Sequence, residues 1–172
     1  GGQFNRPDRA LAQAKLLVGQ GVEILDLGAQ STRPGAEDVG AAAELTRLLP
    51  ALQAIRAAIN SGEMRCPPRA DGELGALPLI SVDTFRSAVA EAALEAGADW
   101  INDVSAGQRD PAILPLVAEA GCPYVLMHSR GDSQSMDGLT DYGSVGVVQG
   151  VLTELRQASD RALAVGLRRE QL

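Results

Sequence analysis

Short apolar runs alternate with amphipathic helical patterns along most of the chain. Apolar residues recur at helical spacing over residues 6–20, from 38 or 40 to 59, and over 84–97, 111–120 and 144–165. Between them, short apolar and β-branched runs predict strands at 22–27, 79–82, 99–101 and 122–127. Strands that alternate with helices predict an α/β fold with a parallel sheet.

The central segment, residues 79–107, has the clearest signals for its elements. Its first strand stops at Asp83, Thr84 is a plausible helix N-cap, and Gly97 stands where a left-handed C-cap is expected. The next strand stops at Asn102 and Asp103. We therefore expect Asp83 and Asn102 at equivalent ends of adjacent parallel strands, with both polar groups at one rim.

Polar residues follow the other predicted strands as well. A loop rich in glycine and hydroxyl groups, with Ser31-Thr32-Arg33, follows the first strand, and Met127-His128 ends the last. In a (β/α)8 barrel the loops at this rim build the active site, and short strands with polar ends favour that barrel over a doubly wound sheet. The run Gly28-Ala29-Gln30-Ser31 also lacks the G-x-G-x-x-G pattern of dinucleotide-binding folds.

Two segments interrupt the regular pattern. Residues 60–78 carry three prolines and three glycines, and we expect a solvent-exposed insertion there. Pro50 lies inside the second predicted helix and predicts a kink or an early break.

Composition narrows the classes of partner. The chain has a net charge of −7, and Lys15 is its only lysine, which argues against a nucleic-acid partner. No apolar run approaches the roughly 20 residues that span a bilayer, and no signal segment opens the chain, so we expect a cytoplasmic protein without a membrane partner. Cys66 and Cys122 lack metal-ligand spacing and are expected to be reduced thiols.

Length and apolar content predict a single domain over residues 1–172. The chain begins without methionine and finishes directly after a helical pattern, with no terminal strand. We therefore expect a piece of a longer protein.

Four segments, in order, resemble the successive signatures of the dihydropteroate synthase family. They are LDLGAQSTRPGA at 25–36, ISVDTF at 80–85, INDVSAG at 101–107 and VLMHSRG at 125–131. The resemblance covers nearly the whole chain except residues 60–78. It implies an incomplete (β/α)8 TIM barrel of the pterin-binding type, with about four of the eight strands, strands 2–5, present.

The resemblance also implies a reaction and roles for individual residues. The reaction joins 6-hydroxymethyl-7,8-dihydropterin diphosphate to 4-aminobenzoate and releases pyrophosphate, assisted by Mg²⁺ whose ligand lies outside this chain. Asp83 and Asn102 match the ligands of the pterin ring, and Val104 and Met127 match its apolar contacts. The loop over aminobenzoate and pyrophosphate is matched by Thr32, Arg33 and Pro34. Asp83 and Arg33 are the expected catalytic residues.

The chain departs from the family pattern at one loop and at both ends. Ala29-Gln30 replaces the usual Gly-Glu before Ser-Thr-Arg, which bears on loop closure. The family's first strand, with its metal-binding asparagine, and its later Asp-Pro-Gly, lysine and Arg-x-His segments would lie outside residues 1–172. We expect the fragment alone to be inactive and poorly folded, and the full-length protein to be a homodimer.

Several alternatives stay open at the level of sequence. A corrinoid-dependent pterin-binding methyltransferase would share the barrel but lack STRPGA, and a non-catalytic pterin-binding module is a rival from another class. His128, the single histidine, is expected to be a hydrogen-bonded structural residue rather than a catalytic base. Asp26 is expected to support the rim through hydrogen bonds.

Overall fold

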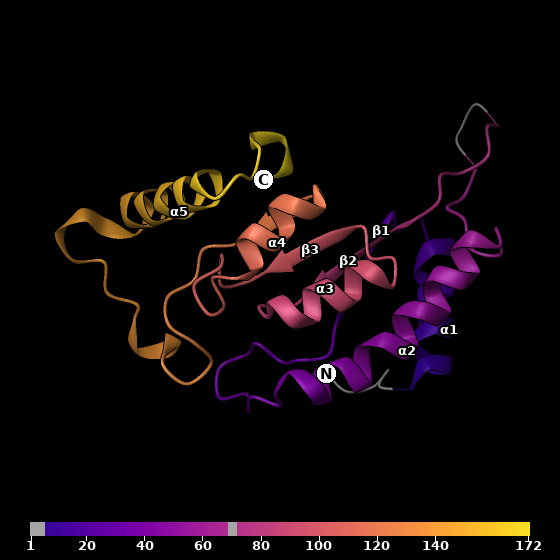
Figure 1. Ribbon diagram of the computed structural model, residues 1–172, viewed down its shortest axis with the longest axis horizontal. Coiled ribbons are helices and arrows are strands. Elements are labelled where there is room, and N and C mark those ends of the chain that lie inside the picture. Colours follow the sequence, from indigo (N-terminus) through magenta and orange to yellow (C-terminus); the bar gives the residue numbers. More distant parts are fainter. Residues whose placement is uncertain (1–5, 69–71) are drawn as a thin grey trace.

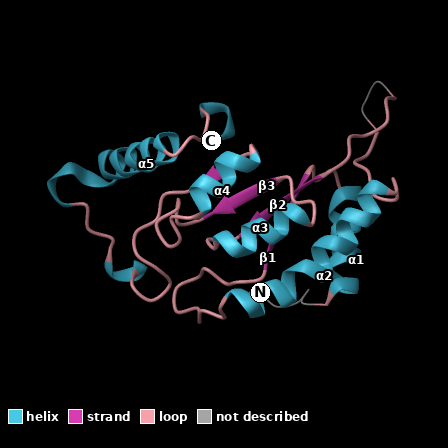
Figure 2. Cartoon of the chain, in the orientation of Figure 1, coloured by secondary structure: helices cyan, strands magenta, loops and turns pink. Residues whose placement is uncertain are grey.

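A parallel four-stranded sheet forms the centre of the computed structural model, which describes residues 6–68 and 72–172. The strands stand in chain order, β1-β2-β3-β4, and Figures 1 and 2 label the first three of them. Their bounds are Ile24–Gly28 for β1, Leu79–Asp83 for β2, Trp100–Asp103 for β3 and Tyr124–Leu126 for β4. The predicted α/β class and the parallel sheet are confirmed.

Helices follow each strand and gather on one side of the sheet. Helix α1, Pro7–Gly19, packs on α2, Ala41–Asn60, which in turn contacts α3, Ser87–Glu95, and α3 contacts α4, Ile113–Ala120 (Figure 1). Helix α5, Gly146–Ala164, follows a long loop that contains two short 3₁₀ turns, and a third turn closes the chain at Arg169–Gln171. Helices on a single side are expected for part of a (β/α) barrel, whereas a doubly wound sheet carries them on both.

The hydrophobic core lies between the sheet and these helices. Ile80, Val82 and Ile101 have no exposed surface, and Tyr124 is 1% exposed. The opposite, inner face of the sheet shows apolar side chains to solvent, with Ile24 38%, Leu79 37%, Val125 39% and Met127 44% exposed. Because successive residues of a strand point to opposite faces, the one-sided core gives every strand one buried and one open face.

Of the two outcomes predicted at Pro50, a kink or an early break, helix α2 excludes the early break. The helix is continuous from Ala41 to Asn60 although proline cannot donate the usual backbone hydrogen bond. Leu48 and Leu52, on either side, are 3% and 0% exposed. Their burial against the core outweighs the lost hydrogen bond.

The prediction of a solvent-exposed insertion at 60–78 is wrong for part of that segment. Met64 and Cys66 are 2% and 8% exposed and belong to the core, and the Cys66 amide donates to the Ala76 carbonyl at 3.0 Å. Residues 69–71 lie outside the described part of the chain. The segment is therefore anchored in the core at Met64 and Cys66.

The central unit follows the prediction with shifted bounds. Thr84 does not cap α3, because its hydroxyl accepts from the Arg86 amide at 3.2 Å and the helix begins at Ser87. Gly97 has the expected left-handed conformation after the helix, with φ +98°. Asn102 and Asp103 are the last two residues of β3 rather than the loop after it.

Both cysteines are free thiols, as expected. Burial raises the pKa of Cys66 and of Cys122, which keeps each thiol in its unreactive neutral form. Among residues 6–68 and 72–172, no helix has the length and apolar character needed to cross a bilayer.

Candidate functional site at the strand ends

Asp83 and Asn102 are paired in register at the ends of β2 and β3. Gly28 of β1 is the partner of Asp83 on the other side, so one layer of the inner face runs from Gly28 through Asp83 to Asn102. A side chain at Gly28 would contact the Asp83 carboxylate, with a Cβ 3.4 Å from Oδ2. The glycine thus leaves room beside this carboxylate at the rim.

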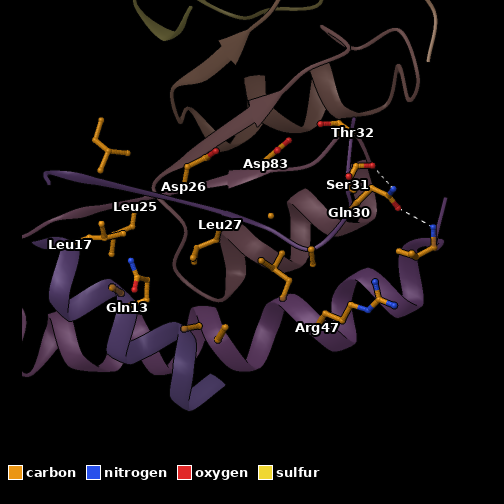
Figure 3. Close-up of a pocket in the computed structure, with 18 of the residues that line it drawn as sticks. Gln13, Leu17, Leu25, Asp26, Leu27, Gln30, Ser31, Thr32, Arg47 and Asp83 are labelled. Atoms are coloured by element: carbon orange, nitrogen blue, oxygen red, sulfur yellow. Dashed lines mark hydrogen bonds between the residues drawn. The ribbon is translucent and has the colours of Figure 1, made fainter. Parts of the chain in front are cut away.

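Asp26, one layer below, orients the amide of Asn102. The Asn102 Nδ2 donates to Asp26 Oδ2 at 3.2 Å. One N–H of the amide is engaged there, so Asn102 keeps its amide oxygen and its second N–H for a ligand. Figure 3 shows Asp26 and Asp83 projecting from their strands toward the same side of the sheet.

The Asp83 carboxyl group is partly buried and lacks a partner on one oxygen. Its Oδ1 is buried and makes no hydrogen bond in the described structure. Burial raises the pKa of Asp83 to about 7, and the negative charges of Asp26, Glu44 and Asp103 add to the effect. A ligand that donates hydrogen bonds to this carboxylate would stabilise its charged form.

The turn after β3 is built around the buried Asp103. This carboxylate accepts from the amide and hydroxyl of Ser105 at 2.7 Å each, from the Gly107 amide at 2.7 Å and from the Tyr124 hydroxyl at 2.6 Å. With these bonds Asp103 joins β3, its following turn and β4. Val104, the predicted apolar contact to the pterin ring, lies in this fixed turn.

Gln30 supports the loop that carries Thr32 and Arg33. Its side-chain amide donates to the Ser31 carbonyl at 2.7 Å (Figure 3). The same amide donates to the Glu37 carbonyl at 2.9 Å, and the side-chain oxygen accepts from the Val39 amide at 3.0 Å. Only 7% of Gln30 is exposed. A carboxylate could accept from Val39 but could not donate to either carbonyl, so glutamine is suited to this conformation of the loop.

A cluster of charges behind the rim holds the far end of the same loop. Arg86 forms ion pairs with Glu44 in the first turn of α2 and with Asp38 before that helix. Arg109 also contacts Asp38, at 3.3 Å, and both guanidinium groups lie over the Phe85 ring, at 4.4 Å for Arg86 and 3.5 Å for Arg109. The loops after β1, β2 and β3 are therefore joined.

A cavity of about 710 Å³ brings part of the predicted site together. Asp83, Thr32 and Arg33 line it along with Asp26 and Gln30, and it continues past β1 to α1 (Figure 3). Its lining omits Asn102, Val104, Met127 and Pro34. Asn102 still neighbours Asp83 through the strand register, and Met127 stands exposed after β4, on the inner side of the sheet.

His128 is hydrogen-bonded within the loop that follows β4. Its Nε2 lies 2.7 Å from Glu154 Oε2 on α5, and Arg130 binds the same carboxylate. The histidine thus links β4 to α5, as the structural interpretation of the sequence expected. In the ranges 6–68 and 72–172, no group of three or more His, Cys, Asp or Glu side chains lies close enough to hold a metal ion.

Sequence reasoning did not identify Gln30 as a support of the loop, and it assigned Glu44, Arg86 and Arg109 no role. The signal for Gln30 was its place between a strand and the Ser-Thr-Arg run, yet a polar side chain inside a loop is usually solvated. Arg86 is 42 or more positions away from each of its two carboxylate partners along the chain. No local sequence pattern indicates contacts of that kind.

A one-sided parallel sheet with a carboxylate and a carboxamide at its rim, and a braced polar loop beside them, defines part of a pterin-binding barrel. The chain belongs to the family described as pterin binding enzyme, whose pattern it matches over residues 1–172. The structure is similar to that of Yersinia pestis dihydropteroate synthase in a sulfonamide drug complex, with a TM-score of 0.83 and 30% identity over 100% of this chain and 55% of that one.

Two further relatives agree. Dihydropteroate synthase from Synechocystis is 43% identical over 145 residues, which cover 84% of this chain and 44% of that protein. The Xanthomonas albilineans dihydropteroate synthase with 4-aminobenzoic acid has a TM-score of 0.77 and 32% identity, over 96% of this chain and 51% of that one. The chain thus spans about half the length of these relatives, and its four strands form a partial barrel.

Proposed function

We propose that this chain supplies the pterin-holding strand ends and the loop over the second substrate in a dihydropteroate synthase. The proposed reaction joins 6-hydroxymethyl-7,8-dihydropterin diphosphate to 4-aminobenzoate, giving 7,8-dihydropteroate and pyrophosphate. The observation that carries the proposal is the pairing of Asp83 with Asn102 in register, next to a cavity that Thr32 and Arg33 share with Asp83.

Asp83 and Asn102 together present hydrogen-bond acceptors to a flat heterocycle. The Asp83 carboxylate, which lines the cavity, accepts from ring and exocyclic N–H groups, and the amide oxygen of Asn102 accepts beside it. Pterin has adjacent N–H donors on one edge, which match this arrangement. Val104 and Met127 flank the same strand ends and are proposed as the apolar contacts to the ring.

Thr32, Arg33 and Pro34 are proposed to close over aminobenzoate and the departing diphosphate. The Arg33 guanidinium would stabilise negative charge that builds on the leaving group, which is the step where a fixed cation contributes most. Gln30 and Asp38 fix both ends of this loop. Arg33 therefore lies on a loop whose two ends are already held in place.

In the proposed reaction, the bond between the pterin methylene carbon and the diphosphate oxygen breaks first. Pyrophosphate leaves with the electron pair, and the cationic methylene is stabilised through the ring by the Asp83 carboxylate. The amine nitrogen of 4-aminobenzoate then attacks this carbon and loses one proton to solvent. The negative charge of Asp83 stabilises the developing positive charge, so the ionised form of Asp83 is the active one.

Mg²⁺ is proposed as the cofactor of the complete protein, where it would neutralise part of the diphosphate charge. The described residues supply no cluster to hold it, so Asp83 and Arg33 are assigned their roles without the ion. We also propose that the complete enzyme is homodimeric and cytoplasmic.

Asp83→Asn tests the proposal in the complete protein that contains this segment. The variant keeps the shape but removes the charge and one acceptor, and we expect kcat/KM for the pterin diphosphate to fall by about 100-fold or more, within the range for loss of one fixed charge at a reacting site. Pyrophosphate release measures turnover. Asp160→Asn, at an exposed carboxylate of α5, is the matched control and should retain activity. Near-normal turnover by Asp83→Asn would overturn the assignment.

A further inference from the structure

The loops that follow the two edge strands of the sheet meet across its rim. The Gly35 amide donates to the Ser133 carbonyl at 2.6 Å, and the Ala36 carbonyl accepts from the Ser133 hydroxyl at 2.9 Å and from the Gln134 side-chain amide at 3.0 Å. Figure 1 shows the orange segment after β4 reaching the purple loop before α2. Since β2 and β3 lie between β1 and β4, this contact bridges the strand ends that carry Asp83 and Asn102.

The loop after β4 is already braced on its own side. Arg130 binds Glu154 of α5 through two nitrogens, donates to the Asp141 carbonyl at 2.8 Å and lies 3.7 Å over the Tyr142 ring. Hydrogen bonds from Arg130 and His128 lower the pKa of Glu154 to about 2, so the pair stays ionised through neutral pH. The segment from Arg130 to Tyr142 is therefore tied to α5 and closed on itself by Arg130.

The tip of that segment is a preformed turn. Asp132 Oδ1 accepts from the Gln134 amide at 3.0 Å and from the Ser135 hydroxyl at 2.7 Å. This turn presents Ser133 and Gln134 side by side. Both side chains donate to the same acceptor, the Ala36 carbonyl.

The loop after β1 is fixed at its base by Gln30 and at its end by Asp38, as described above. Thr32, Arg33 and Pro34 lie between these two points. Gly35 and Ala36, directly after them, are the residues that bond to Ser133 and Gln134. The position of the Thr32–Pro34 segment is thus set from one side by Gln30 and from the other by the turn at Ser133.

We propose that Ser133 and Gln134 are positioning residues, which hold the Thr32–Pro34 segment in the geometry that binds the second substrate. The inference rests on the proposed function of that segment. Ordering a loop before the substrate arrives removes part of the entropy that binding would otherwise cost. The amine substrate meets this loop, whereas the pterin diphosphate is held mainly through its ring at the strand ends, so loss of the contact acts mainly on the KM for 4-aminobenzoate.

The test uses the complete protein with Ser133→Ala and Gln134→Ala combined. We expect KM for 4-aminobenzoate to rise about ten-fold, the effect of two neutral hydrogen bonds that are partly exposed to water, while KM for the pterin diphosphate stays within about two-fold. Amide hydrogen exchange in residues 31–37 should accelerate by a similar factor. Ser133→Thr, which keeps the hydroxyl, should retain the wild-type values in both measurements.

Ser144→Ala is the matched control, since Ser144 is an exposed serine in the same long loop, next to α5. Unchanged exchange in residues 31–37 would overturn the contact, and faster exchange with an unchanged KM for 4-aminobenzoate would overturn its role in binding. A parallel rise of both KM values would also overturn it, because that indicates general damage. If the unmodified protein turns over neither substrate, the proposed function fails, and the exchange experiment still decides whether the contact orders the loop.

Discussion

Asp83 is a carboxylate placed where it is costly to ionise. Burial and the neighbouring charges of Asp26, Glu44 and Asp103 hold its pKa at about 7, against an ordinary value of 3.8. Between these two values the folded chain keeps a proton that the unfolded chain has released, so the contribution of Asp83 to stability declines as the pH rises through this window. A cost in stability of this kind is common for side chains that bind ligands.

Asp26→Asn separates the two roles of Asp26. The substituted amide can still accept from Asn102, while the negative charge that raises the pKa of Asp83 is gone. We expect kcat/KM for the pterin diphosphate to rise at a lower pH than in the wild type. The shift is smaller than the whole elevation of the Asp83 pKa, because burial is the larger cause of that elevation. A pH–rate profile of the complete protein measures it. An unshifted profile, or one shifted to higher pH, would contradict this electrostatic role.

The pairing of Asp83 with Asn102 was predictable from the sequence, but the support of the loop was not. The two residues end consecutive parallel strands, and a short crossover helix leaves little freedom in how such strands align. Gln30, Ser133 and Gln134 bond through their side chains to backbone groups of irregular loops. Gln134 and Ala36 are 98 positions apart in the chain. Such contacts leave no periodic pattern in the sequence.

Among the elements, α2 shows how packing outweighs local preference. Pro50 predicts a kink or an early break, and the helix continues past it because Leu48, Leu52, Ile55 and Ile59 are all buried against the core. The same reasoning explains the burial of Met64 and Cys66 after the helix. Prolines and glycines nearby predict a loop, and only the tertiary structure shows that a loop can also cover the end of a core.

The first turn of α2 carries a fully buried Glu44 that forms an ion pair with Arg86. Arg86→Met would leave that carboxylate unpaired, and we expect the free energy of unfolding to fall by about 3–5 kcal/mol. Combining it with Glu44→Leu removes the buried charge as well and should restore most of the loss. Urea unfolding of the complete protein measures both.

Arg168→Met is the matched control for that pair of variants. Arg168 and Glu170 form an exposed ion pair, with side chains 55% and 70% exposed. Solvent screens exposed pairs of this kind, so a small effect on the free energy of unfolding is expected. If Arg86→Met proved as mild as this control, the buried pair would not stabilise the start of α2.

At the scale of the whole molecule, the four strands have one covered face and one open face. Ile24, Leu79, Val125 and Met127 are between 37% and 44% exposed on the open side. β1 and β4 also have one edge each with no strand partner in the described sheet. Apolar surface and free strand edges together promote association between copies.

A polypeptide limited to residues 1–172 is therefore expected to self-associate and to bind a hydrophobic dye. Both effects follow from the apolar inner face and the unpaired edges of β1 and β4. Size-exclusion chromatography with light scattering, next to the complete protein, measures the first, and dye fluorescence the second. A monomer with a single cooperative unfolding transition and little dye binding would contradict the expectation.

The order of the strands bears on how such a protein forms during synthesis. Each strand pairs with the one that precedes it in the chain, from β1 to β4. As residues leave the ribosome, every new strand and helix can therefore add to an edge that already exists, without waiting for distant segments. The rim residues from Gln30 to Gln134 can come together in the same sequence, so that the nascent chain completes this side of the site while translation continues.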